Sequence, residues 1–301
     1  MRRLRVLVIV LSALGAQAVS AAGSADEAAR RGRSVREIKR VLRSSGFFDG
    51  TVIQGSGSYG GAYGSSSAAR AVAAEDDATL PVAWGRKWDD VSKTYTITVD
   101  GDTATAVVNV SNEGTLYVDL SDDGVKNPGT RSFSTKMSRT ATLSKDSNGK
   151  WKIESISVGV AGLADSSAQT VNVTSVTVDS SLSITDPTSE IDVDDILEAA
   201  PGEEIVVEAT ASNSTSSGLS PTTFVFLHSG PGYHRTQMTD DGTGADRAAG
   251  DGVYTASFTV PEGADYGRAH LAVDAIDSQT LQSESGPDYN WSVWLIGYRV
   301  D

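Results

Sequence analysis

The stretch TDDGTGADRAAGDGVYTASF, residues Thr239–Phe258, holds four aspartates and four glycines. Carboxylate oxygens and the free backbone carbonyls of a glycine-rich loop are ligands that calcium accepts, because it takes six to eight oxygens in flexible geometry. The same residues also build turns, since aspartate caps turns with its side chain and glycine supplies positive φ angles. Both interpretations stay open, and the spacing, which lacks the register of an EF-hand, favours the turn. The candidate calcium ligands are Asp240, Asp241, Asp246 and Asp251.

Few other residues could support catalysis. The chain has three histidines and no cysteine, and it contains no G-x-S-x-G sequence of the kind that presents a nucleophilic serine. His228 and His234 flank the turn sequence SGPGY, where we expect two surface histidines in preference to a metal pair, and His270 lies in an ordinary alternating strand. We therefore predict that the protein is not an enzyme.

A cluster of aromatic residues is the remaining candidate for a site. Ligand pockets combine aromatic walls with a few polar groups. Because aromatic side chains mostly lie in the core, the favoured interpretation is that these form the core and that the arginine among them lies on the surface. The candidate pocket residues are Trp84, Arg86, Trp88, Tyr95 and Trp151.

The N-terminus has the pattern of an export signal. Three arginines among the first five residues precede the apolar segment Val6–Leu14, and small residues follow it. This order is typical of a secretory signal peptide. We predict a signal peptide over residues 1–22, cleaved between Ala18 and Gly23, and a secreted or periplasmic protein without a transmembrane segment in the mature chain.

Charge and cysteine content limit the partners. The 301 residues carry a formal charge of −14, and from Ile153 onward four basic residues face 23 acidic residues, a charge of −19. Acidic surfaces repel nucleic acid, so we expect no nucleic-acid partner. Disulfides and thiolate metal sites are excluded, and we expect no cofactor apart from the open question of calcium.

Hydrophobic periodicity places one helix before a series of strands. Apolar residues at helical spacing predict a helix over Ser34–Ser45, followed by a flexible loop rich in glycine and serine. From Trp84 the period changes to two. The turn sequences Asp100–Asp102 and Asn148–Gly149 predict two hairpins, because glycine at a tight turn allows the positive φ that the turn requires.

This first half resembles the nuclear-transport-factor-like fold, the α+β cone shared with SnoaL-type cyclases. The resemblance rests on the sequence Trp84-Gly85-Arg86, on the strand DGDTATAVV and on the closing strand WKI. It implies a curved antiparallel sheet packed against helix over residues 34–160, with a pocket between them.

The second half is predicted to be all-β. Five segments have strand character, and short strands at this spacing suggest a sandwich. They are EEIVVEATA, TTFVFLH, VYTASFTV, GRAHLAVDAI and NWSVWLIGYRV. The pattern DDGTGxDxxAGDGVYT resembles the extracellular bacterial Ig-like modules found among "choice-of-anchor" surface domains of uncharacterised exported proteins. We thus expect an α+β domain over 34–160, a linker or first strand over 161–180 and an Ig-like sandwich over 181–301.

The functional hypothesis follows from these limits. We expect a secreted, non-catalytic binding or structural protein of the bacterial envelope or exterior, with an unknown envelope or extracellular partner. The alternative is a small-molecule carrier or enzyme that uses the pocket of the N-terminal domain.

Overall fold

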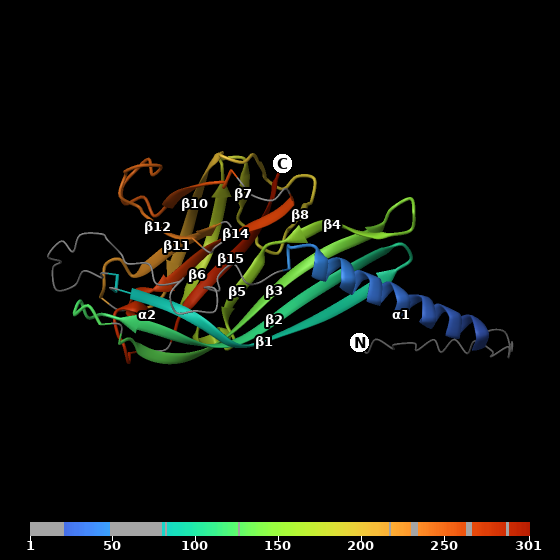
Figure 1. Ribbon diagram of the computed structural model, residues 1–301, viewed down its shortest axis with the longest axis horizontal. Helices are drawn as coiled ribbons and strands as arrows, with labels where there is room; N and C mark the ends of the chain where they lie inside the picture. The colour runs from blue at the N-terminus through green and yellow to red at the C-terminus, as the bar shows by residue number, and fades with distance from the viewer. Residues whose placement is uncertain are drawn as a thin grey trace, which may run out of the picture.

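Strands dominate the protein, and most of them pair antiparallel in two sheets (Figure 1). This computed structural model describes residues 21–48, 80–81, 83–125, 127–216, 218–229, 234–262, 267–286 and 289–301. The prediction of a β-rich chain is therefore confirmed.

The larger sheet joins strands from both ends of the sequence. Its continuous path runs β1-β2-β3-β5-β15-β14-β11-β12. Three short elements lie off this path, with β4 on β3, β8 on β4, and β9 parallel to β15. The strands are β1 (Ala83–Asp100), β2 (Thr103–Asp119), β3 (Gly129–Lys145), β4 (Trp151–Ser157), β5 (Gly159–Leu163), β8 (Glu190–Asp192), β9 (Glu198–Ala199), β11 (Thr223–Ser229), β12 (His234–Met238), β14 (Gly267–Asp277) and β15 (Trp291–Val300).

The smaller sheet has the order β13-β10-β6-β7 and covers one face of the larger one. The described residues contain few helices: a long helix near the N-terminus, a single turn before β15 and a 3-10 turn before β6. These elements are β6 (Val171–Val178), β7 (Leu182–Ile184), β10 (Glu204–Asn213), β13 (Tyr254–Thr259), α1 (Ala21–Ser44), α2 (Ser278–Leu281) and the 3-10 turn η2 (Ser166–Ala168).

Strands β11, β14 and β15 are buried on both faces. Alternate residues point to opposite faces of a strand. Val225, Leu271 and Trp294 face the smaller sheet, whereas Phe226, Ala272 and Trp291 face β1, β2 and β3, which curl over the other side. This arrangement explains why these segments read as nearly continuous apolar runs, the pattern of strands with no solvated face.

A bulge in β1 lets the first hairpin serve two cores. The register between β1 and β2 shifts between Trp88 and Asp90, so Asp89 is an extra residue on β1. The side chains of β1 that face inward are therefore even-numbered before the bulge, as in Trp88, and odd-numbered after it, as in Tyr95. Opposite the bulge, a Cβ on Gly114 would lie 2.5 Å from the carbonyl oxygen of Lys87, so this close approach requires glycine.

The C-terminal end of α1 packs on the larger sheet through a third core. Ile38 and Leu42 are fully buried there, and Phe47 lies against Gly297, where a Cβ would meet the ring at 2.8 Å. Arg139 on β3 donates hydrogen bonds to the carbonyl oxygens of Phe47 and Leu295. Burial lowers the pKa of Arg139 to about 10, and the two carbonyl bonds tie the end of the helix to the sheet.

The observed elements correct several expectations. The helix begins at Ala21, well before the predicted start at Ser34, although it ends as expected. The two hairpins are confirmed, with Gly101 and Gly149 at positive φ. The predicted signal peptide, apart from its last two residues, and the predicted flexible loop rich in glycine and serine that follows the first helix lie outside the described residues.

Strand pairing and core packing continue across the predicted boundary between the two halves. Residues 161–180 contain the end of β5, η2 and β6, and β5 pairs with both β3 and β15. One core also mixes residues of both halves, such as Trp88 and Trp291. The division into units at 34–160 and 181–301 therefore stays a prediction, and within it the two units share a sheet. Neither α1 nor α2 combines the length and apolar content that a bilayer crossing needs, among the residues described.

Candidate functional site

Charged side chains meet in the core between β1 and the central strands. Arg86 on β1, His228 on β11 and Asp274 on β14 point the same way as their apolar neighbours two residues away, because strand side chains alternate. Arg235 joins them from β12, where it pairs with His228 in the strand register. We refer to Arg86, His228, Arg235 and Asp274 as the buried ion cluster.

Asp274 is the centre of this cluster and has no exposed surface. Arg86 binds it with both terminal nitrogens, at 2.8 and 3.0 Å, in the two-pronged geometry typical of strong arginine–carboxylate pairs. His228 Nε2 lies 2.9 Å from the second carboxylate oxygen, Oδ2. Both carboxylate oxygens therefore have partners, which a buried charge requires.

Burial and the neighbouring charges set the protonation states. Burial lowers the pKa of His228 and outweighs the opposing effect of Asp274, so the ring is neutral and its Nε2–H donates to the carboxylate. Burial alone would raise the pKa of Asp274, but Arg86 and His228 outweigh it and hold that pKa below its usual value. Burial, with help from Arg86, lowers the pKa of Arg235 to about 10.

Aromatic rings enclose the two arginines. The Arg86 guanidinium lies 4.6 Å from the ring centre of Trp291 and 5.5 Å from that of Tyr289. The Arg235 guanidinium lies 3.7 Å from the ring centre of Trp84. The negative faces of the rings attract these cations, which compensates part of the cost of burying the guanidinium of Arg86 and partly burying that of Arg235 beside one carboxylate.

Three polar atoms in this core have no hydrogen-bond partner within the described part of the chain. They are Arg86 Nε, Tyr289 Oη and Trp291 Nε1, and all three are donors. Burial raises the pKa of Tyr289 well above its usual value, so its hydroxyl keeps its proton. Such atoms are uncommon in a folded core, where buried polar groups are normally paired.

The cluster lacks the parts of a catalytic triad. Nucleophilic catalysis needs a hydroxyl or thiol within hydrogen-bond reach of the base. Among the described residues, no serine or threonine hydroxyl is hydrogen-bonded to His228 or Asp274. What the geometry does provide is a bond between strands that are far apart in the sequence, since Arg86 and Asp274 are separated by 188 positions.

The structure divides the predicted pocket residues between two cores. Trp84, Arg86 and Trp88 lie together in the core that holds the buried ion cluster. Tyr95 and Trp151 belong to the core under α1. The five residues therefore do not line one pocket.

The sequence interpretation placed two titratable side chains wrongly. Arg86 and His228 were expected at the surface, but each is only 6% exposed. The sequence reasoning also missed Asp274. The available signal was an aspartate within the apolar alternation HLAVDAI, because an acid in a buried strand demands a charged partner.

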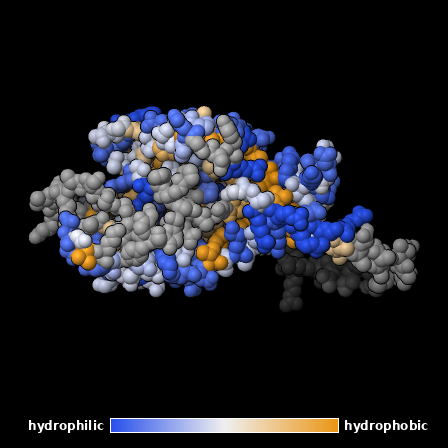
Figure 2. Space-filling view, in the orientation of Figure 1, coloured by the Kyte–Doolittle hydropathy of each residue, from blue (hydrophilic) through white to orange (hydrophobic). Residues whose placement is uncertain are grey.

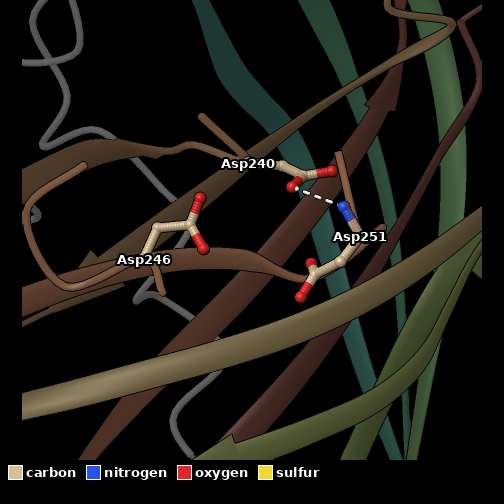
Figure 3. Close-up of side chains that lie close together, drawn as sticks. All are labelled: Asp240, Asp246 and Asp251. Atoms are coloured by element: carbon tan, nitrogen blue, oxygen red, sulfur yellow. Dashed lines mark hydrogen bonds between the residues drawn. The ribbon is translucent and has the colours of Figure 1, made fainter. Parts of the chain in front are cut away.

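The aspartates of the glycine-rich loop form a second, separate group near β13. Oxygen atoms of Asp240, Asp246 and Asp251 lie within 4.8 Å of one another (Figure 3). Asp241 is not part of this group, and its side chain instead accepts hydrogen bonds from the backbone N–H and the hydroxyl of Thr243.

Backbone N–H groups already donate hydrogen bonds to these carboxylates. Asp240 accepts hydrogen bonds from the N–H groups of Gly250, Asp251 and Gly252, the second of which is drawn in Figure 3. Asp246, which is mostly buried, accepts from Gly242 at 2.6 Å. These are the bonds of side-chain-capped turns. They support the interpretation of the loop as a turn, and calcium binding stays a prediction.

Comparisons with known proteins identify no family. No family model and no curated protein matches the chain. Among solved structures, a Niemann-Pick type C2 protein from the Japanese carpenter ant matches with a TM-score of 0.26 and 10% identity, over 44% of this chain and 94% of that one. We draw no inference about fold or function from a similarity of this size.

Proposed function

We propose that this protein is an exported, non-catalytic binding or structural protein that acts in the cell envelope or outside the cell. The observation that carries the proposal is that the centre of the buried ion cluster is inaccessible to solvent and already hydrogen-bonded within the protein. Asp274 is inaccessible and fully bonded by Arg86 and His228, so the group of side chains best suited to acid–base chemistry is committed to joining strands. Export rests on the signal pattern of the N-terminus, and the cone and Ig-like assignments of the two halves are part of the same proposal.

The test compares wild type with Asp274→Asn, which removes the charge at constant shape. We expect neither protein to hydrolyse ester, peptide or glycoside substrates, and we expect the variant to unfold at a lower temperature. Turnover by wild type that disappears in Asp274→Asn, in a variant that is still folded by circular dichroism, would show that the cluster is catalytic. Mass spectrometry of the protein recovered outside the producing cell tests export, with a mature N-terminus between Ala18 and Gly23 expected.

A second candidate function is a carrier of a small polar ligand. It is favoured by the donors of Arg86, Tyr289 and Trp291 that have no partner among the described residues. A guest that supplies acceptor oxygens to them would stabilise the fold by mass action. Screening small carboxylic acids for a rise in the unfolding temperature, with Tyr289→Phe as the comparison, tests this candidate, because the variant lacks one donor and keeps the ring.

A further inference from the structure

Helix α1 carries a row of cations beside its packed side. Arg36, Lys39, Arg40 and Arg43 follow one another at spacings of three, one and three residues, which places them on one side of a helix. Together with Ser44 they line a shallow pocket of about 400 Å³. We call these four residues the basic face.

The basic face is not neutralised within the described part of the chain. None of its four residues forms an ion pair there, whereas Arg31, one turn earlier, pairs with Glu27. Arg36 with Arg40, and Lys39 with Arg43, are like charges one turn apart, and like-charge pairs at this spacing destabilise a helix. Lys39 and Arg43 lie near the ring of Tyr95, at 5.8 and 5.5 Å, which orients them without adding a negative charge.

The position of α1 separates this positive charge from an acidic body. Residues 21–44 carry seven basic and three acidic side chains, a charge of +4, while residues 45–301 carry −21. Among the described residues, the helix contacts the sheets near its C-terminal end, and its other end extends away from them (Figure 1). Hydrophilic side chains gather over its described part (Figure 2). The protein therefore combines a positively charged helix with a negatively charged body, by which we mean residues 45–301.

We propose that the basic face of α1 binds a linear acidic polysaccharide, a chain of sugars that bear sulfate or carboxylate groups. This inference deepens the proposed binding function and rests on it. Apart from the adjacent Lys39 and Arg40, neighbouring cations on the face lie three or four residues apart, which separates them by about 4.5–6 Å along the axis. This distance is comparable to the length of one sugar residue in an extended chain. Three of the four cations are arginines, whose planar head groups bind carboxylate and sulfate-like oxoanions with two parallel hydrogen bonds.

Other polyanions fit these features less well. A helix that lies on a membrane needs an apolar face to bury, but Ile38 and Leu42 of α1 are already covered by the sheet, and Val35 and Val41 are partly buried. Among the described residues the large hydrophobic side chains that are exposed are Val91 and Val125, and neither is on α1. Double-stranded nucleic acid is stiff and densely charged, so it would bring its phosphates close to the acidic body.

The experiment measures the affinity of the full-length mature protein for a heparin oligosaccharide by titration calorimetry at low and at physiological salt. The test variant is Arg36→Gln/Arg40→Gln/Arg43→Gln. The matched control is Lys87→Gln/Lys136→Gln/Arg247→Gln, which changes the net charge equally at exposed positions of the body. We expect the test variant to bind at least tenfold more weakly than wild type, the control to stay within twofold, and uncharged dextran not to bind.

Several results would overturn the proposal. Wild type that does not bind heparin, or equal losses in both variants, would show that the basic face is not a site. Tighter binding to vesicles containing phosphatidylserine, or to single-stranded DNA, would assign the face to a different partner. These outcomes are separate from the catalytic test of Asp274, because the basic face lies on another element and all proteins are compared only when their circular dichroism spectra match.

Discussion

At the scale of single residues, the Arg86–Asp274 pair predicts an unequal response to substitution. Arg86→Met leaves a buried carboxylate with one partner, and breaking one side of a buried ion pair typically costs about 3–5 kcal/mol. Arg86→Met/Asp274→Leu removes both charges, so we expect it to be more stable than Arg86→Met, although His228 then lacks its acceptor. Urea unfolding of the three proteins checks this order, and a double variant less stable than the single one would contradict it.

His228 makes stability depend on pH. Its folded-state pKa lies below the usual value of 6.5 because of burial, so the unfolded chain takes up the proton first as the pH falls. Stability should therefore decrease below about pH 6.5, by about 1.4 kcal/mol for each unit by which the pKa is lowered. Over this window the facing groups keep their charge, since Arg86 and Arg235 stay protonated and Asp274 stays ionised down to its usual value of 3.8 and below.

The measurement for this prediction is unfolding between pH 7.5 and 5. His228→Gln keeps a side-chain N–H for Asp274 and does not titrate, so its stability should change less over that range than that of wild type. Parallel pH profiles of the two proteins would show that His228 is not responsible.

At the scale of elements, the glycine-rich loop between β12 and β13 predicts no specific response to calcium. Asp240 already binds three backbone N–H groups, and Asp246 binds two. We expect millimolar calcium to leave the thermal unfolding midpoint of the full-length protein unchanged relative to magnesium at equal ionic strength. A rise with calcium alone that is absent in Asp251→Asn would establish a calcium site, because binding only to the folded state would stabilise it by about 2.7 kcal/mol at a hundredfold excess over Kd.

The sequence predicted most elements because their signals are local. Alternating residues and the turn at Asn148–Gly149 specify a hairpin without reference to the rest of the chain. The pairing of β5 with β15 and the meeting of Arg86 with Asp274 depend on residues more than a hundred positions apart. No local pattern records such contacts. Asp274 illustrates the limit, since its buried position was readable from the strand pattern but its partner was not.

At the scale of the whole molecule, the shared sheet predicts a single unfolding transition. All five tryptophans are buried, and they lie in cores on both sides of the predicted domain boundary. Tryptophan fluorescence and far-ultraviolet circular dichroism should therefore give coincident urea transitions, the behaviour of one cooperative unit. Two separated transitions would show that residues 34–160 and 181–301 unfold independently.

The place of β15 in the larger sheet also determines when folding can finish. This strand follows the other described strands in the sequence, yet it pairs with β5 on one side and β14 on the other. The ribosome releases the N-terminal strands first, but the larger sheet cannot be completed until residues 291–300 have emerged. If the chain is exported, it reaches the translocation machinery before β15 can join the two parts of the sheet. During that interval it is incompletely folded and can still be translocated. Truncation by ten residues should then leave a chain that is still secreted but is degraded outside the cell.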